Sequence, residues 1–170
     1  MRKYLFQLGI PIITFILFAL ASKAEQSIGD GKALSIEGTY VFVSRDFAEG
    51  SAVKSLDVKG LMTFTKKYRN FNLTWKTPDG KHFSVSYICE YTLNSDAYQE
   101  TPIYWMLYDE TQGAPDYAVP GDKAKPSAVA AQDGKISFKL NGENISLTFE
   151  GNSLTAVSSE GFIDHWEKVG

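Results

Sequence analysis

Apolar side chains recur at every second position along most of the chain after residue 35, and this alternation restricts the possible fold more than any other feature. In the longest run, 83–93, one parity carries Phe, Val, Tyr, Cys, Tyr and Leu, while the other carries polar residues except for Ile88. Successive side chains of a strand point to opposite faces, so the pattern predicts antiparallel strands with one buried and one solvated face. No helical period follows the first 24 residues. We therefore expect an all-β protein.

Turn signals separate these alternating runs. Pro78-Asp79-Gly80 precedes the run 83–93, and Asn141-Gly142 has the composition of a two-residue hairpin turn that needs positive φ. Further turns are expected at Gly151-Asn152 and Glu160-Gly161. The sequence thus predicts about nine strands, within the ranges 36–44, 61–65, 71–75, 83–93, 103–108, 136–140, 144–149, 154–157 and 162–169.

A sheet of this many short antiparallel strands must hide its edges, either in a barrel or in a sandwich. Strands that follow one another as hairpins favour a closed antiparallel up-and-down β-barrel. Two longer connections, 47–60 and 111–134, have the length of lids or binding loops. Within the second connection, 126–132 could form one or two helical turns.

The N-terminal residues have the three parts of a secretory signal peptide. Arg2 and Lys3 precede an apolar run, 8–21, and the small residues Ser22 and Ala24 follow it. The run is short for a membrane-spanning helix and is interrupted by Pro11. We expect a signal peptide at 1–24 that is cleaved after Ala24, an N-terminal linker at 25–34 and a β-barrel domain at 35–170.

Charge and cysteine content exclude several classes of protein. Cleavage would remove three of the 17 basic residues and none of the 20 acidic ones, which leaves a net charge of −6. Without a basic excess, binding to nucleic acid is not expected. Cys89 is the only cysteine, and it forms no metal-ligand spacing with His82 or His165. We expect no metal, no cofactor and no stable membrane anchor after cleavage, in a secreted or periplasmic protein.

Two short segments resemble a known family. The first strand contains Gly38 followed by Tyr40 and alternating apolar residues, and the segment 154–169 ends in Trp166-Glu-Lys-Val169. Both are similar to the opening and closing strands of bacterial lipocalin-like domains, which are β-barrels of the calycin type. The resemblance covers most of 35–169. It implies a closed barrel with an apolar interior and a mouth covered by loops.

A barrel of this size is either filled by its own side chains or holds one small ligand, and the sequence leaves both alternatives open. Under the second alternative we expect a small apolar or amphipathic ligand. Strand parity does not decide between Tyr104 and Trp105 as the inward residue. The aromatic residues predicted to form the wall of the binding site are Tyr40, Phe42, Trp75, Tyr87 and Trp105.

Two other functions compete with ligand binding. A solid barrel could act as a protein interaction module in the cell envelope, contacting an unidentified partner through the connection 111–134 with its Tyr117 and Val119. Alternatively, Cys89 could act as a nucleophile, since the resemblance includes an isomerase with a thiol inside its barrel. The sequence near Cys89 offers no base to activate it. We therefore expect a buried structural thiol and a protein that is not an enzyme.

The remaining charged clusters suggest solvated surface. Lys66-Lys67-Tyr68-Arg69 is interpreted as a polar turn between two strands. Asp109 and Glu110 end a strand and are expected to face solvent. His165 is expected to be exposed beside Asp164.

Overall fold

The computed structural model describes residues 34–49 and 56–170. These residues form twelve strands and no helix, so the expected all-β class is confirmed. No helix long and apolar enough to cross a membrane occurs in this part of the chain. The predicted signal peptide, 1–24, and all but the last residue of the predicted linker, 25–34, lie outside the described residues.

Each of the nine predicted strands is present, and three short strands occur in addition between residues 116 and 132. In chain order the strands are β1 (Gly38–Phe47), β2 (Leu56–Phe64), β3 (Tyr68–Lys76), β4 (His82–Leu93), β5 (Ala97–Asp109), β6 (Asp116–Ala118), β7 (Ser127–Ala128), β8 (Ala130–Gln132), β9 (Lys135–Leu140), β10 (Ile145–Glu150), β11 (Ser153–Ser158) and β12 (Phe162–Val169).

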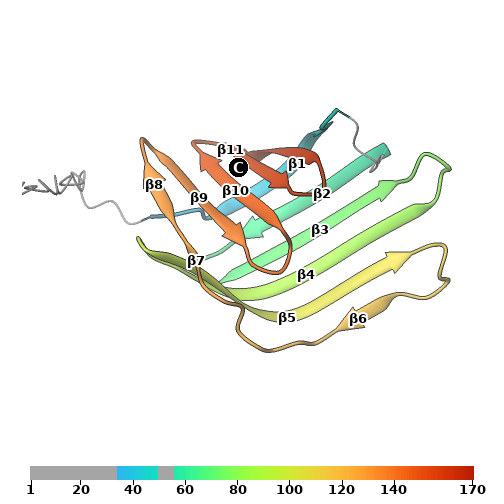
Figure 1. Ribbon diagram of the computed structural model, residues 1–170, viewed down its shortest axis with the longest axis horizontal. Coiled ribbons are helices and arrows are strands. Elements are labelled where there is room, and N and C mark those ends of the chain that lie inside the picture. Colours follow the sequence, from blue (N-terminus) through green and yellow to red (C-terminus); the bar gives the residue numbers. More distant parts are fainter. Residues whose placement is uncertain (1–33, 50–55) are drawn as a thin grey trace, which may run out of the picture. The chain divides into compact units, whose positions relative to one another are not determined.

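All strands belong to one antiparallel sheet with the order β6-β5-β4-β3-β2-β1-β12-β11-β10-β9-β8, and β7 pairs with β5. Figure 1 shows the long strands β2 to β5 side by side, with β6 along one outer edge and β8 along the other. The sheet is an open half-barrel. The prediction of a closed barrel of about nine strands is therefore wrong.

The connection after β5 explains why the sheet stays open. β6 pairs with Trp105–Leu107 of β5, and further along the same strand the N–H groups of Gly121 and Ala124 donate to the carbonyls of Pro102 and Glu100. β7 then pairs with the beginning of β5. The outer backbone groups of β5 are satisfied by this segment, so they are not available to a closing strand.

The end of the same connection crosses to the other edge of the sheet. After β7 pairs with β5, the chain continues directly into β8, which pairs with β9. The two edges are thus linked at one end of the half-barrel. The helical turns considered for 126–132 do not form, because these residues make strand pairs instead.

Aromatic rings fill the interior at this linked end. Tyr98 of β5 stacks on Phe138 of β9 with 3.9 Å between ring centroids. Phe149 of β10 makes edge contacts with Tyr40 at 5.7 Å and with Phe64 at 5.3 Å. These contacts join the two halves of the curved sheet, and all five residues are at least nine-tenths buried. The interpretation that the interior is packed solid holds for this end.

A bulge in β5 determines which of its side chains face inward. Ile88 pairs with Tyr104 and Cys89 pairs with Pro102, so Ile103 has no partner of its own. A bulge of this kind shifts the alternation by one residue. As a result Glu100 and Trp105, whose positions differ in parity, both lie on the inner face beside Tyr87.

Candidate functional site

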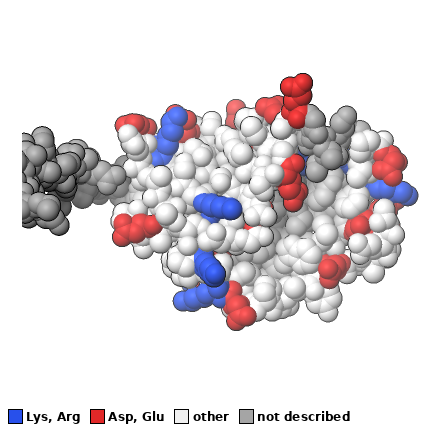
Figure 2. Space-filling model, viewed as in Figure 1, with Lys and Arg blue, Asp and Glu red and all other residues white. Residues whose placement is uncertain are grey.

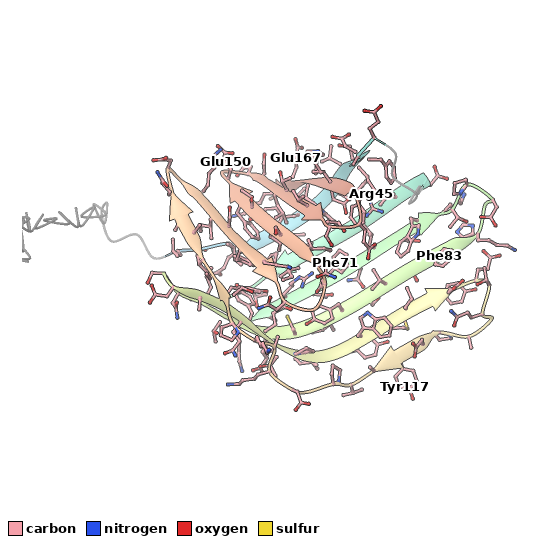
Figure 3. The ribbon with its side chains drawn as sticks, viewed as in Figure 1. Arg45, Phe71, Phe83, Tyr117, Glu150 and Glu167 are labelled. Atoms are coloured by element: carbon pink, nitrogen blue, oxygen red, sulfur yellow. The ribbon has the colours of Figure 1, made fainter. Side chains whose placement is uncertain are left out.

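A pocket of about 460 Å³ lies where the half-barrel is open. One side is formed by β5 and the segment that runs along it, and the other by the turn between β9 and β10. Figure 3 shows Phe71 close to this turn. The pocket is lined by Phe71, Val85, Tyr87, Glu100, Pro102, Trp105, Ala118, Pro120, Ala124, Asn141, Gly142, Glu143 and Ile145. Its volume is within the range of small-molecule sites, about 300–1,000 Å³.

The walls of the pocket are mostly apolar, and they come from four neighbouring parts of the fold. Phe71 projects from β3, Val85 from β4 and Trp105 from β5. Ile145 closes the opposite side from the start of β10. In β3 and β4 the wall residues share one parity, whereas β5 supplies residues of both parities because of its bulge.

A buried arginine lies behind the pocket. Arg69 of β3 is 1% exposed, and its Nη1 donates to Oε1 of Glu100 at 2.9 Å and to Oε1 of Glu143 at 2.8 Å. Its Nη2 donates to Oε2 of Glu143 at 3.2 Å. The guanidinium also lies 5.1 Å from the ring centroid of Tyr87 and 5.4 Å from that of Phe71. The charge of Arg69 is thus compensated by two carboxylates and two aromatic rings.

Glu100 lines the pocket and is 5% exposed. Besides the bond from Arg69, its carboxylate accepts hydrogen bonds from the hydroxyls of Tyr87 at 3.0 Å and Tyr98 at 2.5 Å. Burial alone raises the pKa of Glu100, but the charge of Arg69 and these hydrogen bonds outweigh it and hold the pKa below its usual value. A carboxylate is therefore kept ionised on the inner face.

The same network affects its other members. Burial lowers the pKa of Arg69, but the charges of Glu143 and Glu100 outweigh this effect and raise the pKa above its usual value. The guanidinium therefore stays charged. Burial, together with the charge of Glu100, raises the pKa of Tyr87 and of Tyr98. Both phenols therefore remain protonated and act as hydrogen-bond donors toward Glu100.

Cys89 is fully buried next to this network, as the alternation in 83–93 predicted. Burial and then the charge of Glu100 raise the pKa of its thiol to about 12. A thiolate is consequently not favoured at neutral pH, and thiolates rather than thiols are the nucleophilic form.

The structure brings two of the five predicted wall residues into the pocket, Tyr87 and Trp105. Tyr40 instead belongs to the packed end, where its hydroxyl donates to the carbonyl of Ile36 at 3.2 Å. Phe42 packs edge-on against Trp166 with 5.3 Å between centroids, and Trp75 stacks on Phe83 at 5.5 Å. Neither Tyr40, Phe42 nor Trp75 lines the pocket.

The charged residues of the site were missed at the sequence level. The interpretation of Arg69 as part of a polar turn is wrong, because it lies within β3 and is buried. Arg69 has the same parity as Phe71, Leu73 and Trp75, and this alternation is the sequence signal that could have indicated its position on the inner face. Glu100 precedes the predicted strand 103–108, and Glu143 lies in a turn, so no alternation pointed to either.

Other candidate residues lie elsewhere. The Nε2 atom of His165 is 3.0 Å from Asp46, on a side chain that is 40% exposed, whereas Asp164 is buried and paired with Arg45. His82 is exposed. No group of three or more His, Cys, Asp or Glu side chains among the described residues is placed to hold a metal ion. Figure 2 shows charged side chains of both signs scattered over the face that it presents.

No family model matches the chain, and no curated protein or solved structure does so either.

Proposed function

We propose that this protein is an exported binding protein, similar to bacterial lipocalin-like domains, that holds one small amphipathic molecule. The observation that carries the proposal is the pocket of about 460 Å³, whose apolar walls meet the buried carboxylate of Glu100. Binding sites for small molecules commonly combine apolar walls with a few fixed polar groups.

The two segments that resemble lipocalin-like domains support this proposal by their placement. β1, which contains Gly38 and Tyr40, pairs with β12, which contains Trp166. The similar segments are thus neighbouring strands at the middle of the sheet order. The expected signal peptide would place the protein in the periplasm or outside the cell.

Catalysis is not part of the proposal. Cys89 lies beside the buried network, and its raised pKa and full burial give its thiol neither charge nor access. The carboxylate near it stabilises the protonated thiol rather than the thiolate.

Tryptophan fluorescence tests the binding proposal. Trp105 lines the pocket, whereas Trp75 and Trp166 do not, so a bound molecule should change the emission of the protein and not that of a Trp105→Phe variant. Suitable probes are octanol, octylamine and octanoate, which share a tail and differ in their polar group. We expect saturable binding of at least one of them.

A matched pair of variants distinguishes the pocket from other surfaces. Val85→Phe adds volume inside the pocket, while Val43→Phe makes the same change at a valine of β1 that is 54% exposed. Binding should be lost in the first variant and retained in the second. If none of the three probes binds, or if Val85→Phe binds as well as the unmodified protein, the binding proposal is wrong.

A second candidate function is supported by one separate observation. Tyr117 and Val119, in and beside the edge strand β6, are 67% and 71% exposed, and Figure 3 shows Tyr117 at this edge. An exposed edge strand with apolar side chains can pair with a strand of another protein. We propose as the alternative that this edge contacts a protein partner. A partner captured by the protein should be lost with Tyr117→Ser and Val119→Ser, while Val85→Phe should retain it.

A further inference from the structure

The charged groups at the floor of the pocket do not balance one another. Arg69 contributes one positive charge, and Glu100 and Glu143 contribute two negative charges. No Lys, Arg or His occurs among the described residues that line the pocket. The inner surface therefore carries an excess of one negative charge, close to the aromatic rings of Phe71, Tyr87 and Trp105.

The carboxylates at this floor keep acceptor positions open, while the donors directed at them are already used. Arg69 Nε, the donor of this network that has no partner among the described residues, is fully buried. Tyr87 already donates its hydroxyl proton to Glu100, and Arg69 donates to both carboxylates. A carboxylate offers about four acceptor positions. The hydrogen bonds described above use three of these on Glu100 and two on Glu143. Acceptor positions thus remain open on the same side chains that carry the excess charge.

An anionic ligand would not find the one cation of the site accessible. The side chain of Arg69 is 1% exposed, whereas that of Glu143 is 29% exposed and forms part of the pocket surface. An anion would first meet Glu143 and would have to displace it from Arg69. It would then also lie near Glu100. Repulsion from both carboxylates opposes such binding.

From this arrangement we infer that the pocket selects an amphipathic cation, an amine whose ammonium group lies beside Glu143 and Glu100 and whose apolar part lies against Val85 and Trp105. The inference rests on the proposed binding function and adds the chemical class of the ligand. Carboxylates satisfy the charge and the N–H donors of an ammonium group, and aromatic rings attract the same charge.

The charge preference can be measured with octylammonium, octanol and octanoate at neutral pH, by tryptophan fluorescence and by calorimetry. These probes have equal tails, so differences in affinity report on the polar group. We expect octylammonium to bind about tenfold more tightly than octanol, and octanoate to bind most weakly.

A matched pair of variants locates the charge that is responsible. Glu143→Gln removes one carboxylate of the floor, and Glu150→Gln removes an exposed carboxylate of β10 that pairs with Lys135. Glu143→Gln should lower the affinity for octylammonium about tenfold and leave that for octanol within about twofold. Glu150→Gln should change neither.

The outcomes separate this inference from the binding proposal. If octanol binds in the pocket but octylammonium is not preferred, or if octanoate binds best, the inferred ligand class is wrong and the binding function stands. If no probe binds, both are wrong. If Glu143→Gln does not fold, the order of the three affinities in the unmodified protein decides the question alone.

Discussion

Replacing Arg69 by Met should destabilise the protein far more than a comparable change at the surface. The substitution keeps an unbranched side chain up to about the position of Nε and removes the charged group that compensates Glu100 and Glu143. Lys135→Met is the matched control, because Lys135 and Glu150 form an ion pair of nearly equal length, 3.0 Å against 2.9 Å, on side chains that are about half exposed.

The expected magnitudes follow from burial. At 2.9 Å, opposite charges attract by about 6 kcal/mol at an effective dielectric constant of about 20. Removing one partner of a buried pair costs about 3–5 kcal/mol, because the other charge remains desolvated. Glu100 would be that charge, on a side chain that is 6% exposed. The exposed control pair should contribute less than about 1 kcal/mol.

Urea unfolding, with equal slopes in all variants, gives the free energies of unfolding. The double variant Arg69→Met, Glu100→Gln should be more stable than Arg69→Met alone, since it no longer buries an unpaired carboxylate. If Arg69→Met destabilised the protein no more than Lys135→Met, the buried ion pairs of Arg69 would not stabilise the fold as described.

Three further predictions concern other parts of the structure. Gly60→Ala should destabilise the protein by about 1–3 kcal/mol in urea unfolding, because a Cβ atom at this position would lie 2.9 Å from both the backbone oxygen of Asn72 and the ring of Trp166. Unchanged stability would contradict this close packing. Cys89 should react slowly with a thiol reagent in the folded protein and rapidly in urea, since it is fully buried and its pKa is raised to about 12; rapid labelling of the folded protein would contradict both. Folding lowers the pKa of Glu100, so the stability that its carboxylate contributes should be complete above its pKa in the unfolded chain, about 4.3, and should be lost as the pH falls through its pKa in the folded protein. The melting temperature of Glu100→Gln should therefore depend less on acid pH than that of the unmodified protein.

Much of the strand content could be predicted because alternation is a local property. The alternation in 83–93 correctly predicted which residues of β4 face inward, including Tyr87 and Cys89. The start of β5 was missed because Gln99-Glu100-Thr101-Pro102 contains no run of alternating apolar residues. There the inner face carries Glu100, whose burial depends on Arg69 from another strand.

Closure of the barrel could not be judged from local patterns. It depends on whether the outer edge of β5 is free, and backbone hydrogen bonds from Gly121 and Ala124 occupy that edge. Neither residue is part of an alternating run, so sequence periodicity gave no sign of these bonds. The same segment supplies Ala118, Pro120 and Ala124 to the pocket. The segment that keeps the sheet open therefore also forms one side of the site.

A crystal structure of the protein grown with octylamine would show whether the open side of the half-barrel is a ligand site. We expect electron density for the probe inside the pocket, with its nitrogen within hydrogen-bond distance of Glu143 or Glu100 and its tail against Trp105. A pocket filled by the rearranged side chain of Trp105, with no probe bound there, would contradict it.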